Sequence, residues 1–191
     1  MIVNDRLSLT DDNNIKNVNT IITPKELIDW LPVDKKIIKN IKLWRTITQD
    51  IIYKKDNRLL TIVWPCSIHN TEEALDYARK LKLIENKYQN LFIVMRTYFE
   101  KPRTTIWWKW LINDPHLDWT YNIEEWLKKA RKLLLEINKI WLPVSTEFLD
   151  PISPQYIWDL ITWWAIWART TESQIHRELA SWLSATIWFK N

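Results

Sequence analysis

Ile93–Trp110 reads IVMRTYFEKPRTTIWWKW, and this stretch indicates both a strand and a binding site. It begins with three apolar residues of the kind that form a buried strand. Three cations, Arg96, Lys101 and Arg103, follow within eight positions. Pro102 fixes the backbone between two of them, which lowers the entropic cost of aiming both at one ligand. Because arginine offers a planar fork of donors and lysine a point charge, the pattern favours a phosphate or carboxylate site over a solvated basic loop.

The composition is that of a globular protein with a hydrophobic core. The chain has 191 residues, of which 47% are hydrophobic, enough for one domain. Its net charge of +4 favours anionic ligands without by itself implying nucleic acid. The single cysteine excludes an internal disulfide and is typical of a reducing compartment. Asp5 and Arg6 have no apolar run behind them, and no stretch approaches a membrane span, so we expect a cytoplasmic protein without a signal peptide.

The chain is predicted to have a helical preface followed by alternating strands and helices. Thr23-Pro24-Lys25-Glu26 combines a capping box with proline at the first helical position, which predicts a helix to about Leu31. Apolar residues at helical spacing predict a second helix over about 34–53. The predicted strands are 59–63, 91–98, 142–148, 165–169 and 185–190, and the helices between them are 70–88, 122–140, 153–162 and 173–183.

This alternation predicts a parallel sheet in an α/β fold. The strands have polar residues at or just after their carboxyl ends, namely Cys66, Arg96, Glu147, Arg169 and Lys190. A ring of this kind favours a (β/α)8 TIM barrel, which keeps its active site at that end, over an open doubly wound sheet. Since only five strands are present, we expect a barrel truncated after about the fifth strand, at 58–191, with an N-terminal helical extension at 1–57. Its open edge would expose unpaired strand and apolar surface.

Five segments resemble one known family. They are MRTYFEKPRTT at 95–105, WPCSIH at 64–69, EFLD at 147–150, ARTTESQIHRELAS at 168–181 and WFKN at 188–191. In this order and spacing they are similar to class I 3-deoxy-D-arabino-heptulosonate-7-phosphate (DAHP) synthases. The resemblance runs from about Thr23 to the last residue. The chain departs from the family pattern in two ways. The family's glycines are missing, and the chain stops after the fifth predicted strand.

The resemblance implies a metal-assisted, aldol-type condensation of phosphoenolpyruvate with erythrose 4-phosphate, the first step of the shikimate pathway to aromatic amino acids. It implies one divalent metal ion, a homo-oligomer (dimer or tetramer) in the full-length protein, and feedback control by an aromatic amino acid. Neither nucleic acid nor a membrane is expected as a partner. The family's N-terminal extension contributes to the subunit interface and to this control. The metal ligands other than cysteine lie beyond residue 191 in the family, so we expect this chain alone to be inactive.

The resemblance also assigns roles to individual residues. It places catalytic groups at Arg96 and Lys101, and a thiolate metal ligand at Cys66. The positions that bind phosphoenolpyruvate match Arg96, Lys101, Glu147, Ala168, Arg169 and Lys190. The segment that receives erythrose 4-phosphate matches Lys101, Pro102, Arg103 and Thr104. Asp150 and Pro154 match the region where the family's inhibitor binds.

Other interpretations remain open at the level of the residues. Arg169 and Lys190 could be rim charges, and a lone cysteine such as Cys66 is usually a small hydrophobe. The chain could be a non-catalytic remnant. Basic charge with interleaved aromatics also suggests a nucleic-acid-binding module. The placement disfavours the last class, because the aromatics occupy turn positions and most lysines lie among glutamates on helices.

The tryptophan content is abnormal. The chain has 15 tryptophans and 0 glycines, whereas average usage predicts about 13 glycines in a chain of this length. Trp64, Trp119 and Trp141 stand at strand ends and turns, where glycine serves because it accepts φ > 0 and close backbone approach. Against the family pattern, Trp108 and Trp163 match genuine tryptophans, and most of the others match glycines. We hypothesise that most of these residues are glycine in the cell, either because a reassigned stop codon has been translated as tryptophan or because the sequence has been edited. A genuinely tryptophan-rich protein is the alternative.

Overall fold

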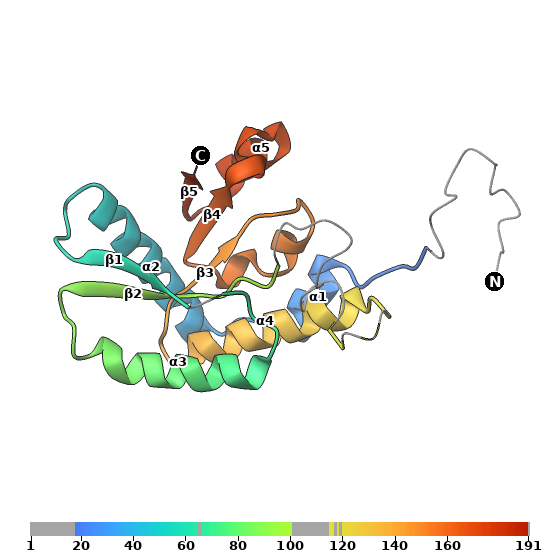
Figure 1. Cartoon of the computed structure of the whole chain (residues 1–191), viewed down its shortest axis with the longest axis horizontal. Helices are drawn as coiled ribbons and strands as arrows, with labels where there is room; N and C mark the ends of the chain where they lie inside the picture. The colour runs from blue at the N-terminus through green and yellow to red at the C-terminus, as the bar shows by residue number, and fades with distance from the viewer. Residues whose placement is uncertain (1–17, 65, 101–114, 117, 119, 191) are drawn as a thin grey trace, which may run out of the picture.

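Five parallel strands form the centre of the fold. The structure, a computed structural model, describes residues 18–64, 66–100, 115–116, 118 and 120–190 (Figure 1). The strands are β1 (Leu59–Val63), β2 (Leu91–Arg96), β3 (Val144–Glu147), β4 (Trp163–Trp167) and β5 (Thr186–Lys190). They pair in sequential order, and the sheet curls as half of a barrel (Figure 1). The strand order of a doubly wound sheet would reverse at a switch point, so the order found here confirms the predicted partial TIM barrel.

Two long helices cover the outer face of the sheet. Helices α3 (Thr71–Glu85) and α4 (Ile123–Lys139) contact each other, and they contact β2 and β3 respectively (Figure 1). Each begins after an asparagine, Asn70 or Asn122, whose side chain accepts hydrogen bonds from backbone N–H groups of the first turn. After β4, a 3-10 helix η3 (Ala168–Glu172) and helix α5 (Gln174–Trp182) lead to β5. The three central strands, β2, β3 and β4, are mostly buried, which explains the apolar runs of β2 and β4.

The N-terminal helices pack against the strands and against the 3-10 segment after β3. Helix α1 (Pro24–Trp30) begins at the predicted capping box, in which Thr23 and Glu26 bond reciprocally. Helix α2 (Lys35–Ile52) contacts β1, β5, η2 (Trp158–Leu160) and the residues just before β4 and β5. There the Arg45 guanidinium donates to the carbonyls of Ile161, Trp158 and Ser184 at 2.7–3.1 Å, and buried residues of α1 and α2 join the same core as the strands. In the part of the chain that the structure describes, no helix combines the length and the apolar composition needed to cross a bilayer.

The predicted elements differ from those observed by up to three residues at several ends, and two differences affect the site or the type of element. The fourth strand begins two residues earlier than predicted, because Trp163 and Trp164 pair with β3 residues. Ala168 and Arg169 consequently start η3 and do not end the strand. The helix predicted at 153–162 is two short 3-10 helices, η1 (Ser153–Tyr156) and η2 (Trp158–Leu160). Ile157 separates them because its φ of −134° and ψ of −4° leave the helical region.

Candidate functional site

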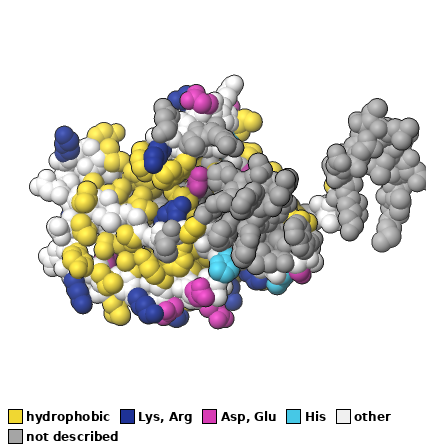
Figure 2. Space-filling model, viewed as in Figure 1, with side chains coloured by type: hydrophobic (Ala, Val, Ile, Leu, Met, Phe, Trp, Pro, Cys, Tyr) yellow, Lys and Arg dark blue, Asp and Glu magenta, His cyan; other side chains and the backbone are white. Residues whose placement is uncertain are grey.

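The carboxyl edge of the sheet gathers the polar residues that the sequence predicts there. Arg96, Glu147 and Lys190 are the last residues of β2, β3 and β5, and Cys66 follows β1. Because the strands are parallel, all of these ends face the same side of the half-barrel. Figure 2 shows hydrophobic side chains around the strands on the left of the view, with basic side chains among them.

The Arg96 guanidinium is held in a defined direction. One of its Nη atoms donates to the Cys66 carbonyl oxygen at 3.0 Å, which ties the end of β2 to the loop after β1. Its central carbon lies 3.8 Å from the centroid of the Tyr98 ring, so the guanidinium stacks on a buried aromatic face. The side chain remains half-buried. A planar cation fixed in this way can present its other N–H groups to a carboxylate or phosphate.

An aromatic pair connects Arg96 to Lys190. The Trp167 indole N–H donates to the Tyr98 hydroxyl at 3.2 Å. The Lys190 ammonium lies 4.7 Å from the centroid of the Trp167 ring, and Trp167 and Lys190 are direct partners in the β4–β5 ladder. Burial raises the pKa of Tyr98 above its usual value, although the Trp167 bond and the Arg96 charge lower it. The hydroxyl therefore stays protonated, and two cations from separate strands lie around one aromatic pair.

Glu147 is the acidic member of this edge. Burial raises its pKa to about 7, and the charge of Arg96 opposes that shift. Glu147 also lines a cavity of about 10 Å³ together with Trp126 and Trp164, a volume at the lower limit for one water molecule. Near neutral pH the carboxyl is therefore divided between its neutral and charged forms.

Cys66 is the predicted metal ligand. It is half-buried and is not in a disulfide. Among the described residues, no three His, Cys, Asp or Glu side chains lie together where they could share a metal ion. A firmly held metal needs several ligands in a fixed geometry. These residues on their own therefore do not form a metal site.

The two residues predicted near an inhibitor site have different surroundings. Asp150 orders the turn before η1, because one of its carboxylate oxygens accepts from the N–H groups of Ile152 and Ser153, both at 2.7 Å. Pro154 is buried and lines an apolar groove of about 460 Å³ between α1, the η1–η2 region and α5. The other residues that line this groove are Pro24, Lys25, Ile28, Phe148, Pro151, Gln155, Trp158, Leu179, Trp182 and Leu183.

Several predicted site residues cannot be placed against this geometry. Lys101, Pro102, Arg103 and Thr104 lie outside the residues that the structure describes, and the side chains of Ala168 and Arg169 are also outside that description. Their assigned roles remain predictions.

Tyr98 and Trp167 are at the centre of the site, and the sequence reasoning did not select them. A period of two places Arg96 and Tyr98 on the same face of the extended chain, and this signal alone could have indicated the stacking. The contact of Trp167 depends on the register of β4 against β5, which the sequence does not specify.

Comparisons with known proteins identify the family. The model of the DAHP synthetase I family matches residues 30–191. The phospho-2-dehydro-3-deoxyheptonate aldolase of Haemophilus influenzae is 48% identical over 182 residues, which are 95% of this chain and 50% of that protein. The Phe-sensitive enzyme of Escherichia coli K12 is 50% identical over 95% of this chain and 52% of its own length.

A solved structure gives the same result at the level of the fold. The phospho-2-dehydro-3-deoxyheptonate aldolase of Francisella tularensis SCHU S4 superposes with a TM-score of 0.89 at 50% identity, over 93% of this chain and 52% of that one. The chain thus spans about half the length of the relatives it matches. Since the family match covers most of its residues, the chain belongs to the DAHP synthetase I family.

Proposed function

We propose that the protein condenses phosphoenolpyruvate with D-erythrose 4-phosphate to give DAHP and inorganic phosphate. Membership of the family and the names of the relatives support this reaction. The observation that carries the proposal is that Arg96, stacked on the Tyr98 ring, and Lys190 end two strands at the same carboxyl edge of the sheet. Two cations at the same edge of the sheet suit a small ligand that carries both a carboxylate and a phosphate.

The surroundings of Arg96 favour binding of such an anion. The guanidinium is already ordered by the Cys66 carbonyl and the Tyr98 ring, so less conformational entropy is lost when a ligand arrives. Lys190 supplies a mobile point charge on the other side. Because Glu147 keeps its proton up to about pH 7, it repels the anion less than a permanently charged carboxylate would. Lys101 and Arg169 are proposed to complete this site, with Ala168 lining it.

In the proposed reaction, the methylene carbon of phosphoenolpyruvate forms a carbon–carbon bond with the aldehyde carbon of erythrose 4-phosphate. Water adds to the resulting cationic carbon, and inorganic phosphate leaves. Lys101, Pro102, Arg103 and Thr104 are proposed to hold the phosphate of the aldehyde substrate. The main task of these residues is to keep two anionic substrates side by side, which converts an encounter of two molecules into an intramolecular step.

The family resemblance implies a divalent metal bound through Cys66. The described residues do not complete its ligand set. We therefore expect the 191-residue chain alone to bind phosphoenolpyruvate without turning it over.

We further propose that an aromatic amino acid regulates the protein. Three groups of relatives are named as Trp-, Tyr- and Phe-sensitive. The apolar groove beside Pro154 is large enough for an aromatic side chain, and Asp150 lies at the start of the same η1 segment. Residues 1–57 are proposed to form the oligomerisation and regulatory extension.

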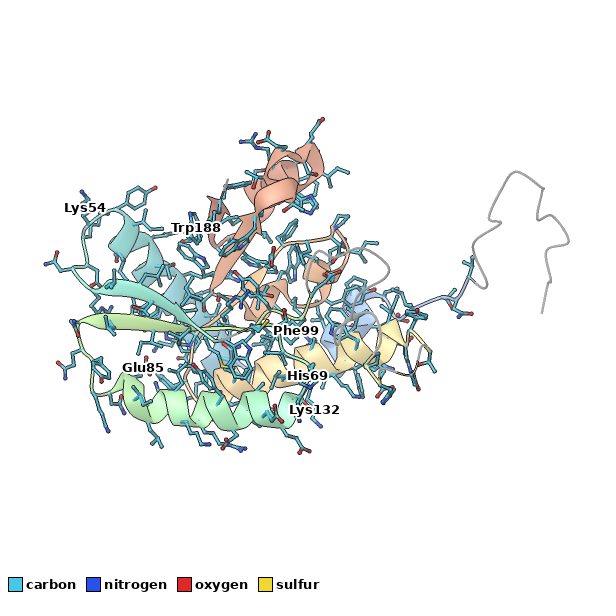
Figure 3. All side chains as sticks on the ribbon, in the orientation of Figure 1. Lys54, His69, Glu85, Phe99, Lys132 and Trp188 are labelled. Carbon is cyan, nitrogen blue, oxygen red and sulfur yellow. The ribbon has the colours of Figure 1, made fainter. Side chains whose placement is uncertain are left out.

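The test is product formation by the whole gene product, supplied with phosphoenolpyruvate, erythrose 4-phosphate and a divalent metal. Arg96→Ala is expected to lower turnover by about a hundredfold or more, because one donor to the developing charge is lost. Lys132→Ala is the matched control, because this exposed lysine lies on α4. Figure 3 shows it far from Trp188 of β5, the strand that ends at Lys190. Absence of DAHP with the unaltered protein, or equal loss in both variants, would refute the proposal.

A further inference from the structure

Trp141 has a backbone conformation that suits glycine. It follows α4 and the cap residue Ile140, and its φ is 64°. Its N–H donates to the Asn138 carbonyl at 3.0 Å, which closes the last turn of the helix. Glycine commonly occupies this left-handed position after a helix because it has no Cβ. The side chain is 43% exposed, and its ring contacts the Lys36 ammonium, 5.1 Å from the ring centroid. In the described part of the chain, Lys54 and Tyr121 also have positive φ, so this feature alone does not establish an assignment.

Trp164 occupies the buried centre of β4 without satisfying its polar atom. The side chain is 0% exposed, and the indole nitrogen has no hydrogen-bond partner. Buried polar groups are nearly always hydrogen-bonded. Trp64 and Trp126 show the same defect, and the indoles of Trp126 and Trp164 both border the small cavity beside Glu147. The indole nitrogen of Trp163, which matches a genuine tryptophan of the family pattern, also has no hydrogen-bond partner.

Trp167 occupies the space between the two cations of the candidate site. Its indole contacts Tyr98, Lys190 and the Trp188 ring, whose centroid is 5.4 Å away. An anion that bridges Arg96 and Lys190 would need this space. With glycine at position 167, the ammonium of Lys190 would lose its aromatic partner and become available to a ligand. This step rests on the proposed function, whereas the arguments at 141 and 164 do not.

Tryptophan in place of glycine accounts for the features at positions 141, 164 and 167. The chain has 15 tryptophans and 0 glycines, and tryptophan occupies positions that need a left-handed backbone, a small buried side chain or an open binding edge. We infer that residues 141, 164 and 167 are glycine in the protein that its own cells make, and that residue 163 is tryptophan. The codon translated as tryptophan at the first three positions is read as glycine by that cell.

One tryptic peptide tests the inference. Cleavage after Lys139 and Arg169 releases residues 140–169, which include all four positions and no internal lysine or arginine. Tandem mass spectrometry of this peptide from the native protein should give the residue mass of glycine at 141, 164 and 167. Position 163 is the internal control and should give tryptophan. Tryptophan at 141 would overturn the inference, and tryptophan at 164 or 167 would overturn it for that position.

The gene provides a second readout. The codon at 163 is expected to differ from the codon shared by 141, 164 and 167, and one common codon at all four would overturn the inference. Neither readout depends on activity. Glycine in the peptide with no DAHP formed would refute the proposed function alone, whereas tryptophan in an active protein would refute only this inference.

Discussion

At the end of β3, the Glu147 carboxyl has a pKa of about 7 against an ordinary value of 4.5, chiefly because burial disfavours its charged form. Between these two values the folded protein keeps the proton while the unfolded chain loses it. The folded state therefore binds more protons, and the free energy of unfolding decreases as the pH rises through this window. Above about pH 7 the destabilisation is complete.

Glu147→Gln should remove this pH dependence. Because the carboxyl is only half-buried and solvent screens it, we expect a gain of about 1–2 kcal/mol in the free energy of unfolding at pH 8, and almost none at pH 4. Urea unfolding at several pH values measures the difference. Glu178→Gln on the exposed surface of α5 is the control and should leave the pH profile unchanged. A gain that is equal at both pH values would contradict this explanation.

The positive φ of Trp141 leads to a second prediction. Trp141→Gly should raise the free energy of unfolding of the 191-residue chain by about 1 kcal/mol, because glycine accepts a φ of 64° without a steric penalty. Trp30→Gly is the matched control, at an exposed position with ordinary helical geometry at the end of α1. Glycine there should lower stability by about 0.5–1 kcal/mol. If both variants were destabilised in chemical denaturation, strain at 141 would be excluded.

At the scale of elements, Arg131 joins α4 to three other segments. Its side chain is 0% exposed and donates to the carbonyls of Leu31 and Tyr156, both at 2.9 Å. It also forms a two-pronged ion pair with Asp159, at 2.7 and 2.8 Å. A buried pair of this kind is costly to break from one side, because the remaining carboxylate and carbonyls stay unsatisfied.

Arg131→Met should therefore lower the free energy of unfolding by about 3 kcal/mol, towards the low end of the usual range because Asp159 remains 27% exposed. Lys132→Ala, one position along on the exposed face of α4, should change it by less than about 0.5 kcal/mol. Equilibrium urea denaturation distinguishes them. Similar midpoints for the two variants would mean that the Arg131 network contributes little.

Local signals explain which elements could be predicted from the sequence. The capping box at Thr23 and the asparagine caps at 70 and 122 depend on neighbouring residues only, and the helices begin where these signals stand. The start of β4 was wrong by two residues, because Trp163 joins the sheet through its pairing with Ser145 on another strand. The break at Ile157 was also missed, since it arises from packing and not from a helix-breaking residue.

At the scale of the whole molecule, the sequence predicts where the site lies better than it predicts its contacts. Strand ends fall on one edge of any parallel sheet, so Arg96, Glu147 and Lys190 could be grouped before the structure was known. The stacking of Arg96 on Tyr98 and the position of Trp167 required the curvature and register of the sheet. Distances across strands far apart in sequence are set by tertiary packing, for which a single sequence carries no direct signal.

The two outer strands of the half-barrel predict how the chain behaves in solution. Within the described residues, β1 and β5 each pair along one side only. Large apolar side chains are exposed on them, with Leu59 at 65% and Phe189 at 37%. Unpaired strand edges with exposed hydrophobic residues pair with further chains. We therefore expect the 191-residue chain to self-associate through these edges as its concentration rises.

The double variant Leu59→Glu/Phe189→Glu tests this expectation, because like charges on both edges repel in any edge-to-edge arrangement. Sedimentation equilibrium should show the unaltered chain above its monomer mass of 23.3 kDa and the variant close to that mass. Ile175→Glu is the control, since Ile175 is 56% exposed on α5 and belongs to neither strand. Self-association that persists in the double variant but disappears in the control would show that the chains associate through the surface of α5 and not through the strand edges.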